Sequence, residues 1–291
     1  MNFGILTLAT QDDYLKAIGL ALSLKVSNPG VPLAVACNPP HLKPLLAPHF
    51  DFVIDQLPDV KGFAQKVYLD HYTPFDRTLF LDSDIFVFKP VAPFIQAWGD
   101  VPYVATGRYV TGGYSPFRFD RDALLKQRGW KQLVCIDGAG HAYFCKPECQ
   151  AVFDRAREIT ANYKEIAGDI KYADEDVMNI VMTEFNVAPP SRHLFFSRYL
   201  SAKKGTLDMD ASLGKCYFVQ AGSTLKGQPY EPCIMHFADS EAPLAYTIQL
   251  YKLFSKFGLP TKVLFKFGAK LFWKRHIKPP IFRGMKKLGI R

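Results

Sequence analysis

The residues best suited to chemistry are two aspartates, Asp82 and Asp84, which lie between two apolar runs. The runs, residues 78–81 and 85–88, are typical of buried strands. Because an unpaired buried carboxylate is costly, both side chains are expected to reach water, a cation or a ligand at the edge of a sheet. With only Ser83 between them, they can bind one hard cation, Mn²⁺ or Mg²⁺, whose remaining positions phosphate oxygens often fill. The alternative is a turn with capping aspartates.

The segment before these aspartates alternates between apolar strands and helices. Strands are expected at residues 3–9, 32–36, 52–55 and up to Asp82, and helices at 14–26, 41–46 and 62–72. Such alternation favours an α/β fold with a mostly parallel sheet. Ligands of such sheets bind at the carboxyl ends of the strands, so the loop at residues 10–14 and the two aspartates are expected to face one crevice.

The pattern after residue 92 is less regular. Residues 92–131 are interpreted as a functional loop with at most a short helix near 121–127. Strands at 134–136 and 142–145 then bracket Asp137-Gly-Ala-Gly140, and helices are expected at 147–162 and 174–185. Three acidic residues crowd the first turn of the last helix, namely Asp174, Glu175 and Asp176.

Composition indicates a globular protein, because 48% of the 291 residues are hydrophobic. The six cysteines form no Cys-x-x-Cys pair, which argues against a zinc knuckle and against a disulfide scaffold. Reduced, buried thiols in a cytoplasmic protein are therefore expected. The first ten residues lack a basic stretch and are interpreted as a buried strand, not as a targeting segment.

The net charge of +9 comes from the end of the chain. Twelve of the 36 basic residues follow residue 241, where there is no acidic residue, so residues 1–241 have a net charge of −3. This distribution excludes a nucleic-acid-binding body.

Within the basic tail, Lys262, Lys266, Lys270 and Lys274 recur every fourth residue. Apolar residues fall on the opposite side of the helix that this spacing predicts: Leu264, Phe267 and Leu271, flanked by Phe265, Phe272 and Trp273. The pattern is typical of an interfacial helix at an anionic inner membrane surface, and it predicts a peripheral membrane protein. The alternative is a helix that packs on the body with a solvated basic face.

The motifs, taken in order, resemble those of the family 8 retaining glycosyltransferases of the GT-A fold, the group of glycogenin and the bacterial lipopolysaccharide galactosyltransferases. The resemblance covers roughly residues 2–243. It implies a GT-A domain at 1–243, a mostly parallel sheet flanked by helices, followed by the tail at 244–291. The implied activity is metal-dependent transfer of a hexose from a UDP-sugar to a glycan or glycolipid, in the synthesis of cell-surface polysaccharide.

The resemblance also implies contacts with the nucleotide sugar. The segment Thr7-Leu-Ala-Thr-Gln-Asp-Asp-Tyr14 is similar to the family's nucleotide loop, in which a tyrosine packs on uracil. Lys66, sixteen residues before Asp82, matches a lysine that contacts the donor. The residues so implied are Thr7, Ala9, Thr10, Asp13, Tyr14, Lys66 and Ser83, with Gly138, Ala139 and Gly140 under the donor sugar.

The remaining family positions concern the metal and the reacting carbon. His236, in Met235-His-Phe-Ala-Asp239, matches the third protein ligand of the metal, although a packed core histidine is the alternative. Asp174 is expected to orient the donor sugar. Glu175 replaces the family's usual glutamine, and its carboxylate could stabilise or attack an oxocarbenium-like centre. The alternative is that these carboxylates only complement the helix N-terminus.

A second departure lies after His236. Relatives carry a glycine and then a diphosphate-binding lysine, where this chain has Asp239 and Ala242. Arg108 or Lys215 is a candidate replacement cation. Two rival functions stay open: a sugar-nucleotide nucleotidyltransferase, against which the missing glycine-rich phosphate loop counts, and a catalytically weak, membrane-docked protein that binds nucleotide sugars.

Overall fold

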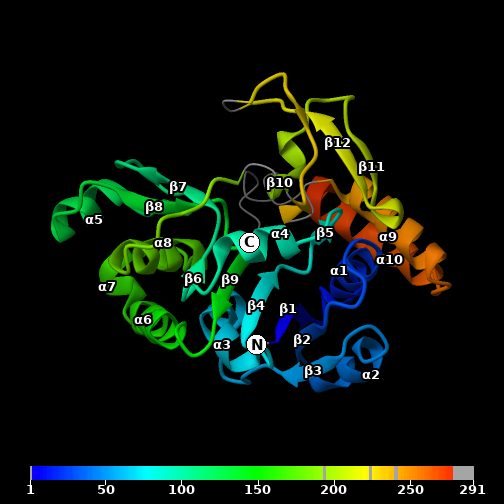
Figure 1. Cartoon of the computed structure of the whole chain (residues 1–291), viewed down its shortest axis with the longest axis horizontal. Coiled ribbons are helices and arrows are strands. Elements are labelled where there is room, and N and C mark those ends of the chain that lie inside the picture. Colours follow the sequence, from blue (N-terminus) through cyan, green and yellow to red (C-terminus); the bar gives the residue numbers. More distant parts are fainter. Residues whose placement is uncertain (1, 193–194, 223–224, 239–241, 278–291) are drawn as a thin grey trace, which may run out of the picture. The chain divides into compact units, whose positions relative to one another are not determined.

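The computed structural model describes residues 2–192, 195–222, 225–238 and 242–277 (Figure 1). The chain forms two compact units, each made of separate segments. Unit 1 comprises residues 1–14, 31–82 and 91–193, and unit 2 comprises residues 15–30, 83–90 and 194–291. The border between them passes between Asp82 and Ser83, in the middle of the acidic motif.

Unit 1 is built on a six-stranded sheet in the order β3-β2-β1-β4-β9-β6. Its strands are β1 (Phe3–Thr10), β2 (Leu33–Asn38), β3 (Phe52–Asp55), β4 (Arg77–Leu81), β6 (Tyr103–Val104) and β9 (His141–Cys145). The first four in sequence pair in parallel, whereas β9 runs antiparallel to both of its neighbours. The predicted mostly parallel sheet is therefore confirmed, and the carboxyl ends of β1, β2 and β4 meet at one edge.

Helices cover one face of this sheet and complete the core of unit 1. The buried cluster includes Leu6 of β1 and Phe80 of β4, together with Phe153 of α6 (Gln150–Ala161) and Val177 of α8 (Asp174–Glu184). The other helical segments of the unit are η1 (Pro40–Leu42), α2 (Lys43–Leu46), η2 (Gly62–Tyr68), α3 (Leu69–Tyr72), α4 (Ala92–Trp98), α5 (Arg121–Arg128) and α7 (Tyr163–Ala167). The predicted helix at 62–72 is thus a 3-10 segment followed by one α-helical turn.

Residues 92–131 contain more regular structure than the sequence predicted. The structure has α4, β6 and β7 (Gly107–Val110) there, besides α5. Each missed element is at most seven residues long, which is too short for a periodic pattern to stand out. The strand β7 pairs with β8 (Leu133–Ile136) in a separate two-stranded ribbon.

Unit 2 includes most of α1 (Tyr14–Ser27), in which every residue from Leu15 to Leu24 is buried. A helix buried on all sides must be packed closely, and Gly19 provides the room: an added Cβ there would lie 2.2 Å from Leu250. Two small sheets complete the unit. The first sheet contains β5 (Ile85–Val87), β10 (Phe196–Arg198) and β14 (Ile234–His236). The second contains β11 (Asp208–Asp210), β12 (Lys215–Val219) and β13 (Pro229–Tyr230). The short helices η3 (Tyr199–Ser201) and η4 (Ala211–Leu213) also belong to this unit.

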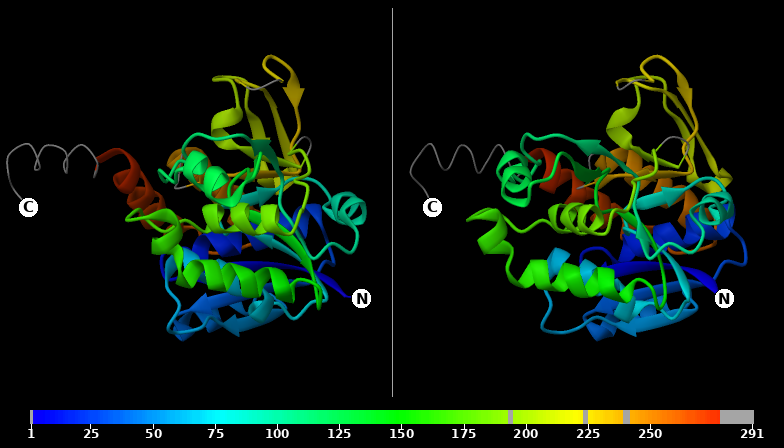
Figure 2. Two further views of the ribbon diagram at one scale, coloured as in Figure 1. Left: turned by 90° about the vertical axis from the view of Figure 1, so that its left-hand side faces the viewer. Right: turned by 60° about the vertical axis from the view of Figure 1, so that its left-hand side comes forward.

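Two helices end the described chain, α9 (Pro243–Lys256) and α10 (Lys262–Phe272), followed by a π-helical turn, Trp273–Ile277 (Figure 2). The sequence placed both in a tail after residue 243. In the structure α9 belongs to the core of unit 2, because Tyr246 stacks on Phe86 with the ring centroids 4.8 Å apart. No helix of the described residues is long and apolar enough to cross a membrane.

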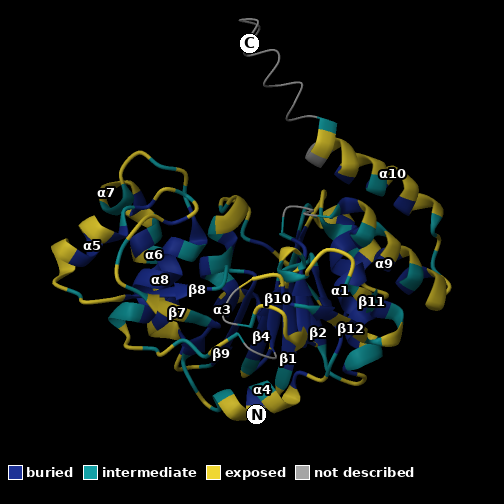
Figure 3. Cartoon of the chain, turned by 90° about the horizontal axis from the view of Figure 1, so that it is seen from above, coloured by how far each residue is buried: buried dark blue, intermediate teal, exposed yellow. Residues whose placement is uncertain are grey.

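The helix α10 uses part of its apolar side within unit 2. Leu264, Phe267 and Leu271 are buried, and an added Cβ at Gly268 would touch Thr247 of α9 at 2.8 Å. In Figure 3, dark-blue and yellow residues alternate along α10, because one side of the helix is buried and the other is exposed. Phe265, by contrast, is 82% exposed. The basic residues from 278 onward lie outside the described part of the chain.

Candidate active site

Asp82 follows β4 at the edge where the parallel strands of unit 1 end. Its position is fixed by the antiparallel partner of β4: Leu81 pairs with His141, and the Asp82 backbone N–H donates to the carbonyl of Gly140 at 2.8 Å. The small residues before β9 therefore lie beside the first aspartate. The family resemblance alone predicts Gly138, Ala139 and Gly140 in the same site.

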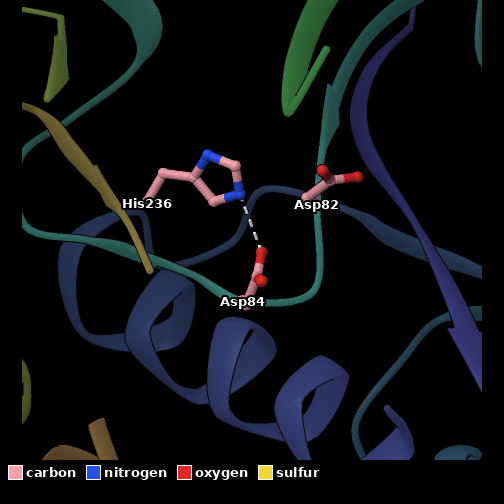
Figure 4. Close-up of side chains that lie close together, drawn as sticks. All are labelled: Asp82, Asp84 and His236. Atoms are coloured by element: carbon pink, nitrogen blue, oxygen red, sulfur yellow. Dashed lines mark ion pairs between the residues drawn. The ribbon is translucent and has the colours of Figure 1, made fainter. Parts of the chain in front are cut away.

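Asp84 and His236 are brought together by strand pairing in unit 2. Antiparallel pairing of β5 with β14 sets Ile85 opposite His236, and the Phe237 N–H donates to the Asp84 carbonyl at 3.0 Å. The His236 Nε2 atom then lies 3.0 Å from Asp84 Oδ1 (Figure 4). The alternative of a histidine packed only among hydrocarbon is not what the structure has.

The three predicted ligands form one group. Asp82, Asp84 and His236 each offer one ligand atom, and these atoms all lie within 4.8 Å of one another. Two carboxylate oxygens and an imidazole nitrogen make a mixed O/N donor set, which fits Mn²⁺ and also Mg²⁺. With three protein ligands, a six-coordinate ion would keep positions for phosphate oxygens and water.

Lys66 connects the first aspartate with the start of α8, all within unit 1. Its Nζ atom lies 2.9 Å from Asp82 Oδ1, 3.2 Å from Asp174 Oδ2 and 2.9 Å from the carbonyl oxygen of Ala139. Burial works against the charged form of Lys66, but the fields of Asp174 and Asp82 outweigh it and raise the lysine pKa above its usual range. The ammonium group is therefore charged at every physiological pH, and the contact of Lys66 with the donor stays a prediction.

The first turn of α8 carries the two predicted catalytic residues. Asp174 is buried and Glu175 is partly exposed. Gly138 faces Glu175: its φ of +94° is a left-handed conformation that favours glycine, and an added Cβ would lie 4.0 Å from Glu175 Oε2. A side chain at Gly138 would thus narrow the space beside this carboxylate.

The predicted nucleotide loop lies at the carboxyl end of β1. The Thr10 hydroxyl donates to Asp13 Oδ2 at 2.9 Å, and the Asp13 N–H donates to the Thr10 carbonyl at 3.0 Å, so the loop is a closed turn. Tyr14 begins α1 and is partly exposed. Thr7 and Ala9 are buried inside the strand, so among the predicted nucleotide contacts they are the least accessible by their side chains.

Sequence reasoning missed Lys16. Its Nζ atom lies 3.9 Å from Asp84 Oδ2, and its side chain is buried in α1. Within the helical run from Leu15 to Leu24 it is the one charged residue, and a buried charge in an apolar run needs a partner. That rule could have linked Lys16 to the acidic motif.

The two candidate replacements for the diphosphate-binding lysine, Arg108 and Lys215, already face carboxylates. An Arg108 guanidinium nitrogen lies 3.7 Å from Asp137 Oδ1, and Lys215 Nζ lies 2.5 Å from Asp208. Ala242 lies directly before α9, whereas Asp239 is outside the described residues. Lys16, by contrast, is a buried cation of unit 2 that approaches a predicted metal ligand.

Comparison with known proteins gives the fold. No protein-family model matches the sequence, and no curated protein matches it. Among solved structures, the galactosyltransferase LgtC in complex with donor and acceptor sugar analogs matches 92% of this chain and 95% of its own, with a TM-score of 0.55 and 13% sequence identity. The chain has a glycosyltransferase fold.

Two further structures agree with this assignment. A glutamine-to-glutamate active-site mutant of LgtC matches 81% of this chain and 87% of its own, with a TM-score of 0.52 and 14% identity. The bifunctional glycosyltransferase WbbM matches 88% of this chain and 51% of its own, with a TM-score of 0.54 and 10% identity. The predicted fold, a family 8-like GT-A domain, is confirmed; the roles of the individual site residues stay predictions.

Proposed function

We propose that the protein is a metal-dependent, retaining glycosyltransferase that moves a hexose from a UDP-sugar to a glycan or glycolipid acceptor. The observation that carries the proposal is the grouping of Asp82, Asp84 and His236 in a chain with a glycosyltransferase fold. Fold alone would not support an activity, because one fold hosts many functions. The donor set supports binding of a nucleoside diphosphate through a divalent ion.

Different residues of the chain hold the metal ion, bind the nucleoside and position the carboxylates at the donor site. Asp82, Asp84 and His236 hold Mn²⁺ or Mg²⁺, which when bound offsets the negative charge on the departing diphosphate. The loop at residues 10–14 receives the nucleoside, with Tyr14 against the uracil. Lys66 keeps Asp82 and Asp174 in fixed positions, because its ammonium group contacts both carboxylates at about 3 Å.

The first turn of α8 contacts the hexose of the donor. Asp174 orients the hydroxyl groups of the hexose, and Glu175 lies next to it with a partly exposed carboxylate. A carboxylate can stabilise positive charge at the anomeric carbon or attack it, which a glutamine does less well. One of the neighbouring LgtC structures is a glutamine-to-glutamate active-site mutant, so a glutamate at such a site is compatible with the fold.

The proposal also covers the location of the enzyme in the cell. We place the enzyme in the cytoplasm at the inner membrane face, where a membrane-borne acceptor for surface polysaccharide or lipopolysaccharide would be available. Exposed Phe265, Phe272 and Trp273 in the helical segments that end the described chain support this, because aromatic side chains and lysines together favour an anionic interface. Leu264, Phe267 and Leu271 are engaged within unit 2 and do not take part.

The test is an activity assay with a panel of UDP-sugars and Mn²⁺. Release of UDP that EDTA abolishes and Mn²⁺ restores is expected. Formation of UTP and sugar 1-phosphate when pyrophosphate is added to the UDP-sugar would indicate the nucleotidyltransferase, and binding of UDP-sugar without turnover would indicate a binding protein; either result contradicts the proposal. His71→Gln, a change at an exposed histidine, controls for His236→Gln, which should abolish the Mn²⁺-dependent activity.

A further inference from the structure

Arg118 has an unusual backbone conformation. With φ at 71°, it is one of two non-glycine residues in the described chain that adopt a left-handed φ; the other is Asn186, at 54°. This conformation costs free energy in any residue with a Cβ atom, and it persists only where the surroundings impose it. The left-handed conformation of a bulky arginine therefore needs a structural cause.

Hydrogen bonds around Ser115 impose the left-handed conformation of Arg118. The Ser115 carbonyl accepts from the Arg118 N–H at 2.9 Å, and the Ser115 N–H donates to the carbonyl of Phe119 at 3.0 Å. The Ser115 hydroxyl oxygen also accepts from the N–H groups of Phe117 and Phe119, at 3.2 and 3.1 Å. Ser115 and Phe119 are buried. Residues 115–119 thus form a tight turn with a buried base.

The base of the turn is attached to the helix of the proposed active site. The Ser115 hydroxyl donates to Asp176 Oδ2 at 3.1 Å, and the Tyr163 hydroxyl donates to the same oxygen at 3.3 Å. Asp176 directly follows Glu175 in the first turn of α8. Burial raises the pKa of Asp176 to about 6, so holding this carboxylate charged at neutral pH is unfavourable. A group retained at such a cost is a candidate for a functional role.

The outward side of the turn presents charge. Arg118 is exposed, and it forms no ion pair with any residue that the structure describes. Tyr114, just before the turn, is also exposed. A guanidinium group is the side chain best shaped to bind a phosphate or a carboxylate with two parallel hydrogen bonds.

We propose that residues 115–119 form part of the acceptor subsite, with Asp176 as the positioning residue that holds the turn on the first turn of α8 and Arg118 as the contact for an anionic group on the acceptor. The shared chemistry of that group is a phosphate or a carboxylate on a sugar. The inference rests on the proposed glycosyl transfer and specifies its acceptor class.

The first test measures binding without turnover. Ligand-observed NMR would give the affinity of the protein for glucose 6-phosphate, glucuronate and neutral glucose. Glucose 6-phosphate or glucuronate should bind at least about tenfold more tightly than glucose, and the preference between the two charged probes distinguishes phosphate from carboxylate. Arg118→Gly removes the guanidinium and relieves the strained φ, and it should abolish the advantage of the charged probes.

Asn186→Gly is the matched control, because it relieves the other left-handed residue and leaves Arg118 in place. Equal affinity of the wild type and Arg118→Gly for the charged probes would overturn the proposal, as would no preference over glucose. Because these probes need no donor and no metal, failure here is separate from failure of the proposed function, which the UDP-sugar assay detects on its own.

The second test addresses the attachment of the turn. Ser115→Ala and Tyr163→Phe each remove one hydroxyl donor from Asp176 Oδ2, but only Ser115 also bonds within the turn. Hydrogen exchange at the amides of residues 117–119 should become at least about tenfold faster in Ser115→Ala and stay unchanged in Tyr163→Phe. Ser115→Ala should also weaken binding of the charged probe. Unchanged exchange and unchanged binding in Ser115→Ala would contradict the anchoring role.

Discussion

At the scale of single residues, Lys66 is the centre of the proposed site. One ammonium group satisfies two carboxylates, on Asp82 and Asp174, whose side chains are largely shielded from water. Since the pKa of Lys66 is raised on folding, its contribution to stability is fully present below the pKa of an unfolded lysine, about 10.4. The contribution is lost only as the pH rises through the higher, folded-state value.

Replacing Lys66 with methionine should therefore lower the free energy of unfolding by about 3 kcal/mol, because two shielded carboxylates lose their counter-ion. Urea denaturation at pH 7 measures this, and the loss should be constant from pH 6 to pH 9. Lys43→Met is the matched control: Lys43 pairs with Asp55 at 2.7 Å, but both side chains are exposed, so the loss should stay below about 1 kcal/mol. Equal losses in the two variants would show that Lys66 is an ordinary surface lysine.

Glu175 decides whether a carboxylate takes part in the transfer. If it stabilises or attacks the anomeric carbon, Glu175→Gln should reduce kcat by at least about 100-fold with little change in donor affinity. Glu165→Gln, at an exposed glutamate of α7, should leave kcat unchanged. Steady-state kinetics with the active UDP-sugar measure both, and full turnover by Glu175→Gln would eliminate an essential carboxylate.

At the scale of elements, long periodic segments were predictable and short ones were not. The sequence predicted α1, α6 and α8 to within a few residues, because each extends over three or more helical turns. It could not predict the pairing of β5 with β14, two three-residue strands almost 150 residues apart. That pairing is what places His236 beside Asp84, and only the family resemblance had connected them.

The site could be predicted to a similar extent. Spacing and resemblance indicated Lys66 and the acidic motif, but nothing in the spacing showed that Lys66 also contacts Asp174, because that contact depends on where α8 begins in space. The polar partners of Asp176 were missed for the same reason: Ser115 lies in a segment interpreted as irregular, 61 residues before it.

The start of α8 should show a pH-dependent stability. Because the pKa of Asp176 is raised on folding from its ordinary value of 3.8 to about 6, the folded protein binds a proton more readily, and this group favours folding more as the pH falls from 6 to 4. Its Oδ1 atom has no hydrogen-bond partner among the described residues and can carry that proton.

Asp176→Asn removes this titration and still offers an oxygen to Ser115. The variant's stability relative to the wild type should therefore be about 2 kcal/mol more favourable at pH 7 than at pH 4.5. Urea unfolding at the two pH values measures the difference. A relative stability that is independent of pH, or that changes in the opposite direction, would show that burial does not control the charge of Asp176.

At the scale of the whole molecule, charge is divided unequally along the chain. All the excess positive charge follows residue 241, whereas the part before it has a net charge of −3. Since α9 supplies Tyr246 and Leu250 to the core of unit 2, deleting everything after Pro243 would damage the fold, and a membrane test needs point changes instead.

The double change Phe265→Glu and Trp273→Glu removes two exposed aromatic rings and leaves the buried residues of α10 in place. Flotation with liposomes that contain anionic phosphatidylglycerol should show at least about tenfold weaker binding than wild type. Leu213→Glu, at an exposed aliphatic residue of η4, is the control and should bind as the wild type does. Equal flotation of all three proteins would contradict membrane docking through this segment.

The central claim is that Asp82, Asp84 and His236 hold one divalent ion for a nucleotide diphosphate. The most direct measurement is the affinity for Mn²⁺ in the presence of UDP, followed by electron paramagnetic resonance, for the wild type, His236→Gln and the surface control His71→Gln. We expect one Mn²⁺ site whose affinity UDP increases and which His236→Gln weakens by about 100-fold, whereas His71→Gln leaves it intact. Unaltered Mn²⁺ affinity in His236→Gln would contradict the account.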